Sequence, residues 1–436
     1  MMRVVAAAAL AAWGSIAQAE IEIQEVISPG GINAWLVEEH SIPFVSLEIR
    51  IVGGANLDRP GKRGAINLMT GLLEEGSGDL DARAFQSARE GLAASFGYDV
   101  RDDTFVLSFQ ALTENRDEAL DLFRASITDP TFDDVAVERV RAQVIAGIEG
   151  EAQRPNSIAG EVFFAEAFAD HPYGSDMSGT LDSVAALTRA DLVQAHADIL
   201  TRDRIYVGAV GDITPEELAV VLDDLLGALP SGSPDLPTEI DFGLEGGVTV
   251  VDFPTPQAVA LFGHAGIERD DEDFFAAYVL NYILGGGGFE SRLMQEVREE
   301  RGLTYGIGTY LVPKDYAEMV LGSVASDNDT IAEAIEVIRD EWGRLATQGV
   351  TPEELETAKT YITGEYPLRF DGNSEIANIL VGMQVQGLPP EYVINRNGYV
   401  NAVTLEDVNR VAAELLDPDA LHFVVVGQPE GLESSQ

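Results

Sequence analysis

The sequence contains no cysteine and few basic residues, and these absences exclude several functions. Without cysteine, thiol catalysis, disulfide bonds and iron–sulfur ligation are excluded. The 27 Lys and Arg stand against 74 Asp and Glu, so the formal net charge is −47. Nucleic acids and anionic membrane surfaces are bound through clustered Lys and Arg, so this balance argues against both as partners. Beyond the N-terminus, no continuous apolar run reaches the roughly 20 residues that a membrane-spanning helix needs.

The N-terminus has the pattern of a secretory signal peptide. Residues 1–19 contain one Arg, then a short apolar run, and end in Ala17-Gln18-Ala19, which matches an A-x-A cleavage site. Removing them leaves 26 basic and 74 acidic residues, so the mature net charge would be −48. We expect the mature chain to be periplasmic or secreted. The alternative is an uncleaved anchor or a buried apolar N-terminus.

The chain contains an internal repeat. Residues 184–212 align without a gap with residues 400–428, at a constant shift of 216 that takes Thr188 to Thr404. Each copy predicts a Thr-capped amphipathic helix, a short turn and an apolar strand that ends at glycine. Two unrelated helix–strand units could share this pattern by chance, but matched caps, turns and strand ends favour duplication.

A Pro/Gly/Ser-rich stretch, Pro230 to Pro237, lies between the copies and predicts a linker. Each half opens with predicted strands and continues with helices. The clearest strands are Asn33–Val37, Phe44–Gly53, Val248–Asp252 and Ala258–Gly263, and the clearest helix starts are the capping boxes Thr214–Glu217 and Thr351–Glu354. We predict an α+β chain of two homologous halves, each a mainly antiparallel sheet covered by helices. The predicted division is a signal peptide at 1–19, an N-terminal half at 20–229, a linker at 230–247 and a C-terminal half at 248–432.

The common catalytic motifs are absent. The sequence has neither a G-x-x-x-x-G-K-[ST] phosphate loop nor a G-x-S-x-G nucleophile elbow. None of the five histidines is paired with another at the i, i+4 spacing that places two metal ligands on one helix face. We therefore interpret His196, in a predicted helix, and His422, at a predicted strand start, as packing or surface residues.

A run of four glycines has two interpretations. Gly285, Gly286, Gly287 and Gly288 follow an apolar helical stretch, whereas the glycines of a dinucleotide-binding fingerprint follow a strand. One interpretation is a hinge between helices, which needs residues without Cβ. The other is a surface that the backbone of an extended ligand can approach closely.

Arg298 and Tyr305 lie seven residues apart, at the end of a helix predicted at 289–300 and the start of a strand predicted at 303–311. A cation at a helix C-terminus complements the helix dipole, and a strand tyrosine commonly packs. The functional interpretation is that guanidinium and phenol both donate hydrogen bonds to a developing oxyanion.

Several segments, taken in order, resemble the pitrilysin/insulinase family of zinc metallopeptidases, the inverzincins. They are His171-Pro-Tyr-Gly174, Gly179-Thr180, Val210-Gly-Asp-Ile213, Leu284–Leu293 and Arg298–Tyr305. The resemblance covers nearly the whole mature chain and implies the same two-half α+β fold.

The zinc motif of that family is degenerate in this sequence. Its H-x-x-E-H helix supplies two zinc-binding histidines and a glutamate that activates water. In the matching run, residues 64–77, Asn67 and Gly71 occupy the histidine positions and Thr70 the glutamate position. The resemblance places the third ligand near Arg141. It therefore implies no metal site and no cofactor in this chain.

The resemblance also implies a role for what is left. In relatives an arginine and a tyrosine with the spacing of Arg298 and Tyr305 face the zinc, hold the substrate carbonyl and stabilise the tetrahedral intermediate. The glycine run, Gly285–Gly288, is implied to contact extended peptide. Some relatives divide the work between two chains, and this sequence resembles the chain without zinc.

We therefore expect a non-catalytic partner subunit of an exported heterodimeric zinc metallopeptidase that degrades unstructured peptides. A homologous subunit with H-x-x-E-H would hold the zinc, and this chain alone would be inactive. One alternative is a catalytically silent scaffold or peptide-binding protein in which Arg298 and Tyr305 are remnants. Another is a stand-alone protease with an unconventional metal site. The acidic charge would either favour cationic peptides or only provide solubility.

Overall fold

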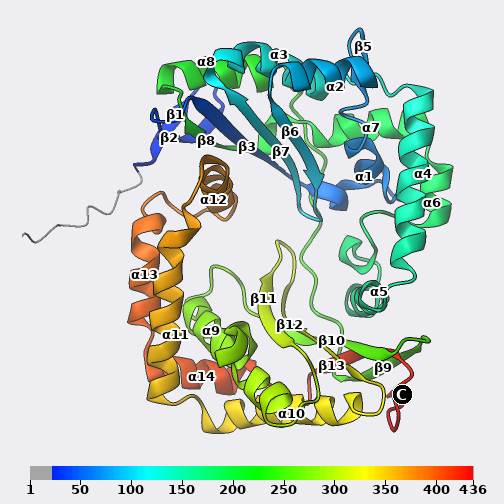
Figure 1. Ribbon diagram of the computed structural model, residues 1–436, viewed down its shortest axis with the longest axis vertical. Helices are drawn as coiled ribbons and strands as arrows, with labels where there is room; N and C mark the ends of the chain where they lie inside the picture. Colours follow the sequence, from blue (N-terminus) through cyan, green and yellow to red (C-terminus); the bar gives the residue numbers. More distant parts are fainter. Residues whose placement is uncertain (1–21, 436) are drawn as a thin grey trace, which may run out of the picture.

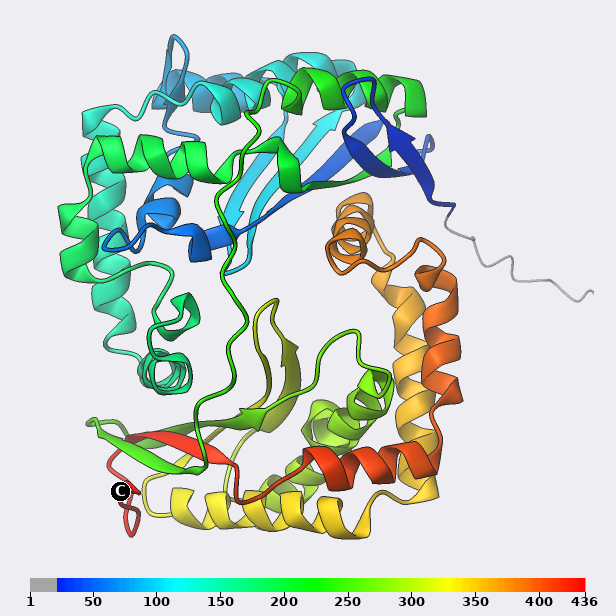
Figure 2. The ribbon, with the colours of Figure 1, turned by 180° about the vertical axis from the view of Figure 1, so that it is seen from behind.

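The computed structural model describes residues 22–435, so the predicted signal peptide at 1–19 lies outside the described residues. The described chain forms two halves, each built on one large sheet (Figures 1 and 2). The N-terminal sheet has six strands in the order β1-β2-β8-β3-β7-β6, and the C-terminal sheet has five in the order β11-β12-β10-β13-β9.

The strands of the N-terminal half are β1 (Gln24–Ile27), β2 (Asn33–Glu38), β3 (Phe44–Val52), β4 (Gly76–Ser77), β5 (Leu80–Asp81), β6 (Ser95–Val100), β7 (Thr104–Leu112) and β8 (Ile205–Gly211). Its helices are α1 (Ala65–Thr70), α2 (Ala82–Gly91), α3 (Arg116–Thr128), α4 (Asp134–Glu151), α5 (Pro155–Phe168), α6 (Leu181–Ala186), α7 (Arg189–Ile199) and α8 (Pro215–Leu226).

The strands of the C-terminal half are β9 (Gly247–Asp252), β10 (Gln257–Ala265), β11 (Ile307–Pro313), β12 (Glu318–Asp327) and β13 (His422–Gly427). Its helices are α9 (Phe274–Asn281), α10 (Ile331–Gln348), α11 (Pro352–Glu365), α12 (Asn373–Val385), α13 (Tyr392–Ala402) and α14 (Leu405–Leu415).

The two sheets have the same topology. The order β2-β8-β3-β7-β6 in the first matches β9-β13-β10-β12-β11 in the second, and β1 is an addition at one edge. In each sheet one pair is parallel, β2 with β8 and β13 with β9, and the other pairs are antiparallel. The predicted fold class, two homologous α+β halves with mainly antiparallel sheets, is therefore confirmed.

Each sheet is covered on its outer face by its own helices. Figure 1 shows α3 and α8 over the N-terminal sheet and α10 and α14 under the C-terminal sheet. Helix starts follow the predicted caps: Thr214 and Thr351 each accept a hydrogen bond from the third helical residue in a complete capping box. These caps satisfy backbone N–H groups that a helix leaves unpaired at its start.

The inner face of each sheet is covered in part by a helix from the other half. Helix α5 packs on β10 and β13, and α12 packs on β3 and β8 (Figure 1). The central strands are therefore buried on both faces. In β13, the consecutive apolar residues Phe423 to Val426 are all fully buried. Segment 227–246, which includes most of the predicted linker, runs between the halves in Figure 2.

The region around residues 289–311 differs from the prediction. The expected helix at 289–300 begins with a separate 3₁₀ turn, Gly288–Glu290, and its later part, Met294–Glu299, is a π-helix. The expected strand at 303–311 begins only at Ile307, because the Thr304 hydroxyl donates to Ala325 O (2.6 Å) and accepts from Gly306 N (3.0 Å). These bonds hold a turn there, so Tyr305 precedes the strand.

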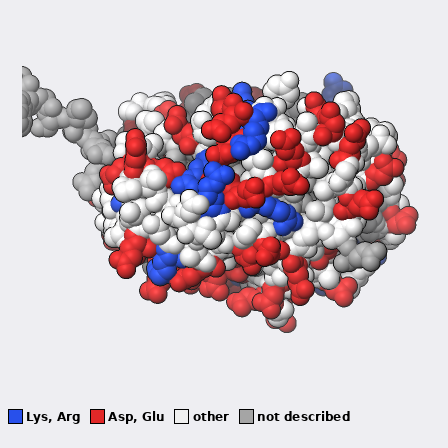
Figure 3. Space-filling view, turned by 90° about the horizontal axis from the view of Figure 1, so that it is seen from below, with Lys and Arg blue, Asp and Glu red and all other residues white. Residues whose placement is uncertain are grey.

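The acidic excess is visible on the surface. Figure 3 shows the face seen from below in Figure 1, where Asp and Glu are spread widely and Lys and Arg gather in one band. None of the helices in residues 22–435 combines the length and the apolar character that crossing a membrane requires.

Candidate functional site

Helix α1, the counterpart of the family's zinc helix, begins at a buried carboxylate. Asp58 accepts hydrogen bonds from Gly64 N (2.7 Å) and Ile66 N (2.9 Å), so it caps the helix from outside. Burial raises the pKa of Asp58 to about 6, and these backbone hydrogen bonds act in the opposite direction. The start of α1 is therefore fixed by the fold and needs no metal.

The residues at the motif positions of α1 do not fit zinc. The Thr70 hydroxyl donates to Ile66 O (2.7 Å) within its own helix, and Thr70 is buried. A Cβ added to Gly71 would lie 2.9 Å from Cγ1 of Val140 on α4, closer than real Cβ contacts. A histidine at position 71 therefore fits only if the Val140 side chain or α4 itself shifts. Asn67 is a poor neutral ligand, so the set lacks the chemistry that zinc requires.

Arg141, next to Val140, has a structural role. Its guanidinium donates to Val184 O at the end of α6, and its Nε lies 3.4 Å from Glu138 Oε1. Arg141 is buried and holds α4 against α6. Within residues 22–435, no group of three or more His, Asp or Glu side chains is placed to hold a metal ion.

The glycine run lies against β11. A Cβ on Gly285 would overlap Thr309 of β11, and one on Gly287 would lie 2.9 Å from the Tyr282 ring. Gly288 has a φ of 56°, which L side chains rarely adopt, and nothing lies within 4 Å of its added Cβ. Close packing therefore explains why glycine stands at positions 285 and 287, and the positive φ explains glycine at position 288. Contact of the run with peptide stays a prediction.

Arg298 and Tyr305 both reach the surface but do not bond to each other. The Arg298 guanidinium lies 4.5 Å from the centre of the Phe289 ring, and its Nε is 3.6 Å from Glu299 Oε1. Tyr305 is 84% exposed. Among the described residues no hydrogen bond joins the two, so each is free to donate to a molecule that approaches from outside.

One π-helical segment, Tyr282–Gly286, includes the first two residues of the glycine run, and a second, Met294–Glu299, follows the run. π-Helical segments are rare in proteins, and those that do occur are often found at functional sites. They widen the helix by one residue per turn, and Arg298 lies in the second of them. Apolar spacing could not predict these segments, because it resembles that of ordinary helices.

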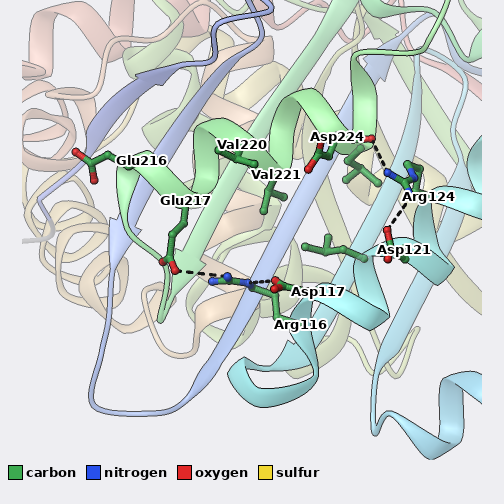
Figure 4. A pocket seen from close by; sticks show the side chains of 11 residues that line it. Arg116, Asp117, Asp121, Arg124, Glu216, Glu217, Val220, Val221 and Asp224 are labelled. Carbon is green, nitrogen blue, oxygen red and sulfur yellow. Dashed lines mark hydrogen bonds and ion pairs between the residues drawn. The ribbon is translucent and has the colours of Figure 1, made fainter.

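One surface cavity, called the smaller cavity here, lies between α3 and α8 and has a volume of about 480 Å³. Figure 4 shows that its two arginines pair with neighbouring carboxylates. Arg116 bonds Asp117 (3.0 Å) and reaches Glu217 (3.5 Å), and Arg124 bonds Asp121 (2.7 Å). The guanidinium groups of Arg116 and Arg124 are therefore already paired with carboxylates of the cavity lining.

The larger cavity, about 1240 Å³, lies between the halves, where the β1–β2 edge meets α12 and α13. Its lining includes three acidic side chains, Glu22, Glu38 and Glu39, and no Lys or Arg. No sequence motif pointed to it, because its lining comes from segments more than 300 residues apart, at 22–40 and at 366–397.

Comparisons with known proteins match two family models to this chain. Residues 34–181 match the insulinase family, peptidase family M16, and residues 186–362 match the peptidase M16 inactive domain. The first match contains α1 and the second contains Arg298 and Tyr305.

Similar proteins extend over almost the whole chain. A non-peptidase homolog named YmxG from Helicobacter pylori is 24% identical over 410 residues, which covers 94% of this chain and 95% of the relative. An uncharacterised zinc protease of Mycobacterium leprae is 26% identical over 399 residues, covering 89% and 88%. A crystal structure of a peptidase M16 inactive domain from Pseudomonas fluorescens superimposes with a TM-score of 0.88 at 27% identity, covering 95% and 100%.

Proposed function

Since the chain belongs to peptidase family M16 and contains that family's inactive domain, we propose that it is the non-catalytic partner subunit of an exported heterodimeric zinc metallopeptidase. The partner, a homologous chain with H-x-x-E-H, holds the zinc and the general base. This chain supplies Arg298 and Tyr305, and unstructured peptides are the substrates. The relative called a non-peptidase homolog supports a role without catalysis by the chain alone.

One observation carries the proposal. In this chain the zinc-motif positions have lost their chemistry, whereas the arginine and tyrosine positions have kept theirs. Thr70 and Gly71 have become part of the packing around α1, where Thr70 bonds its own helix and Gly71 adjoins Val140. Arg298 and Tyr305 keep their spacing and their access to solvent. A chain that had lost all contact with substrate would have no reason to lose only the first set.

In this role both side chains act as hydrogen-bond donors. The guanidinium of Arg298 is always charged, and a charged donor strengthens as negative charge develops on a substrate carbonyl oxygen. The Tyr305 phenol adds a neutral donor. Removal of one such donor costs about 10²–10³ in turnover in other enzymes. The export of the chain rests on residues 1–19 alone.

The test is a cleavage assay with the mature chain and the H-x-x-E-H homologue from the same organism. Each chain alone and the equimolar mixture are incubated with a quenched fluorescent unstructured peptide. We expect cleavage only by the mixture, with turnover lowered about 10²–10³-fold by Arg298→Ala and less by Tyr305→Phe. Arg301→Ala is the matched control, because Arg301 is three residues away and pairs with Glu296 (2.6 Å).

Two outcomes would contradict the proposal. One is full activity of the homologue alone, and the other is a mixture in which Arg298→Ala and Arg301→Ala behave alike. Either result would leave the catalytically silent scaffold as the function of this chain.

A further inference from the structure

The larger cavity differs from the smaller one in the balance of its charges. Around the smaller cavity, Arg116 and Arg124 pair with carboxylates beside them. Around the larger cavity, Glu38 and Glu39 accept hydrogen bonds from neutral donors, Gln24 Nε2 and Ser41 N (both 2.7 Å), and form no ion pair with any Lys or Arg of residues 22–435. His40, a cation only when protonated, lies 3.0 Å from Glu38 and 2.8 Å from Asp212. The larger cavity therefore keeps a negative rim.

A buried amide adds a second, independent feature. Asn373, at the start of α12, lines the cavity and is only 7% exposed. Its Nδ2 is buried and has no hydrogen-bond partner among the described residues. A buried polar group without a partner costs about 1–3 kcal/mol, so a ligand that offers an acceptor to this side chain gains affinity there.

Much of the remaining lining is apolar. Val37 and Val210 lie on the N-terminal sheet beside Glu38, and the C-terminal half forms an apolar wall of Tyr366, Pro367, Phe370, Ile376, Val393 and Ile394. Ile394 is 59% exposed, although it lies beside these apolar neighbours. A large apolar group placed on this wall would remove its surface from water at about 25 cal/mol per Å².

We propose that this cavity binds an extended peptide segment that carries a Lys or Arg next to a large apolar side chain. The cation lies against Glu38 and Glu39, the apolar side chain lies on the wall that includes Ile394, and a peptide carbonyl accepts from Asn373. A peptide fits better than a small amine, because the volume exceeds the roughly 300–1,000 Å³ typical of small-molecule sites. The proposal does not rest on the proposed function, since Arg298, Tyr305 and the glycine run are not part of the lining.

The experiment measures binding to the mature chain alone by fluorescence polarisation at about 0.15 M salt. The probe is a fluorescein-labelled hexapeptide, Ser-Arg-Phe-Lys-Leu-Ser. One comparison peptide has Glu in place of Arg and Lys, and the other has Ser in place of Phe and Leu. We expect saturable binding of one probe per chain, and binding at least tenfold weaker for both comparison peptides, which is about 1.4 kcal/mol.

Variants of the chain locate the site. We expect Ile394→Ser and Glu39→Gln each to weaken probe binding about three- to tenfold. Because Ile394 is exposed and Glu39 lies in a loop, neither change should alter the thermal unfolding curve. Glu216→Gln is the matched control, since it removes the same charge at the smaller cavity and should leave binding unchanged.

Four results would overturn the inference. The first is equal binding of the peptide without apolar side chains, which means general attraction to an acidic chain. The second is equal loss in Glu39→Gln and Glu216→Gln, and the third is unchanged binding by Ile394→Ser. A probe with photoreactive benzoyl-phenylalanine in place of Phe should crosslink within segment 366–397, and crosslinking elsewhere would also refute it. Because no partner subunit is present, the result is independent of the cleavage assay.

Discussion

The two halves exchange equivalent helices, but the contacts that hold these helices are different. Helix α5 lies on the C-terminal sheet mainly through apolar packing, with fully buried Phe163 in one cluster with Val424. Among the described residues, its one polar side-chain contact there is Glu166 with Thr249 (2.9 Å) and His422 (3.3 Å). Helix α12 lies on the N-terminal sheet and adds several hydrogen bonds, including Arg50 Nη2 to Asn378 Oδ1 (2.6 Å). Duplication has therefore kept the position of the helix, while the side chains have made one contact mainly apolar and the other more polar.

The same comparison applies to function. In the N-terminal half, the motif positions of α1 are occupied by side chains that serve packing, as at Thr70. In the C-terminal half, Arg298 and Tyr305 remain accessible, Arg298 within the second π-helical segment and Tyr305 six residues beyond its end. The motif residues of the N-terminal half thus serve packing, whereas those of the C-terminal half remain hydrogen-bond donors in contact with solvent.

The largest expected effect is on the apolar contact. Phe163→Ala removes a fully buried aromatic ring from the interface between α5 and the C-terminal sheet. The lost transfer free energy and the cavity left behind predict a decrease of about 3–5 kcal/mol in the free energy of unfolding. Equilibrium unfolding in urea, followed by circular dichroism, measures it.

The matched variant on the other helix is Asn378→Ala. It leaves one guanidinium nitrogen of Arg50 without its acceptor, at a cost of about 1–3 kcal/mol. Arg50 Nε already has no partner, which limits what the hydrogen bond can contribute. Equal costs for Phe163→Ala and Asn378→Ala would mean that the two contacts do not differ in kind, and the comparison would fail.

The sequence predicted the architecture better than it predicted the exchange of helices. The constant shift that relates Thr188 to Thr404 predicted two like halves, because caps and strand ends are local signals. It could not show that α5 packs on β13, since apolar spacing says that a helix has a buried face but not which sheet covers it. The larger cavity was missed for the same reason: its lining is assembled by that exchange.

The next prediction concerns pH, with opposite signs in the two halves. At the start of α1, burial raises the pKa of Asp58 to about 6 from its ordinary 3.8. The stability that it contributes is present below about pH 4 and is lost as pH rises through 6. At the start of α9, hydrogen bonds from Arg410 lower the pKa of Asp273, so its contribution is present above pH 3.8 and is lost as pH falls further.

Urea unfolding of Asp58→Asn and Asp273→Asn across pH 3 to 8 tests this difference. Relative to Asp58→Asn, we expect the unmodified chain to lose about 3 kcal/mol between pH 4 and 7, because the pKa of Asp58 lies at about 6 and not at 3.8. Relative to Asp273→Asn it should lose stability only below pH 4, and by less, because that ion pair is exposed. If the stability contributions of Asp58 and Asp273 were lost over the same pH range, the causes assigned to their two pKa shifts would be wrong.

The last prediction concerns the lost zinc motif, and the expected effect of restoring it is no gain in zinc binding. The triple variant Asn67→His, Thr70→Glu, Gly71→His restores H-x-x-E-H in the sequence of α1. We expect it to retain no stoichiometric zinc after dialysis, measured by elemental analysis, because the new Cβ at position 71 meets Val140 and the expected third-ligand position, near Arg141, holds no ligand. Adding Val140→Ala removes the first obstacle while leaving α4 otherwise intact. Zinc in the quadruple variant alone would assign the loss to this contact, whereas zinc in the triple variant would show that α1 still accepts the motif and has lost only its ligands.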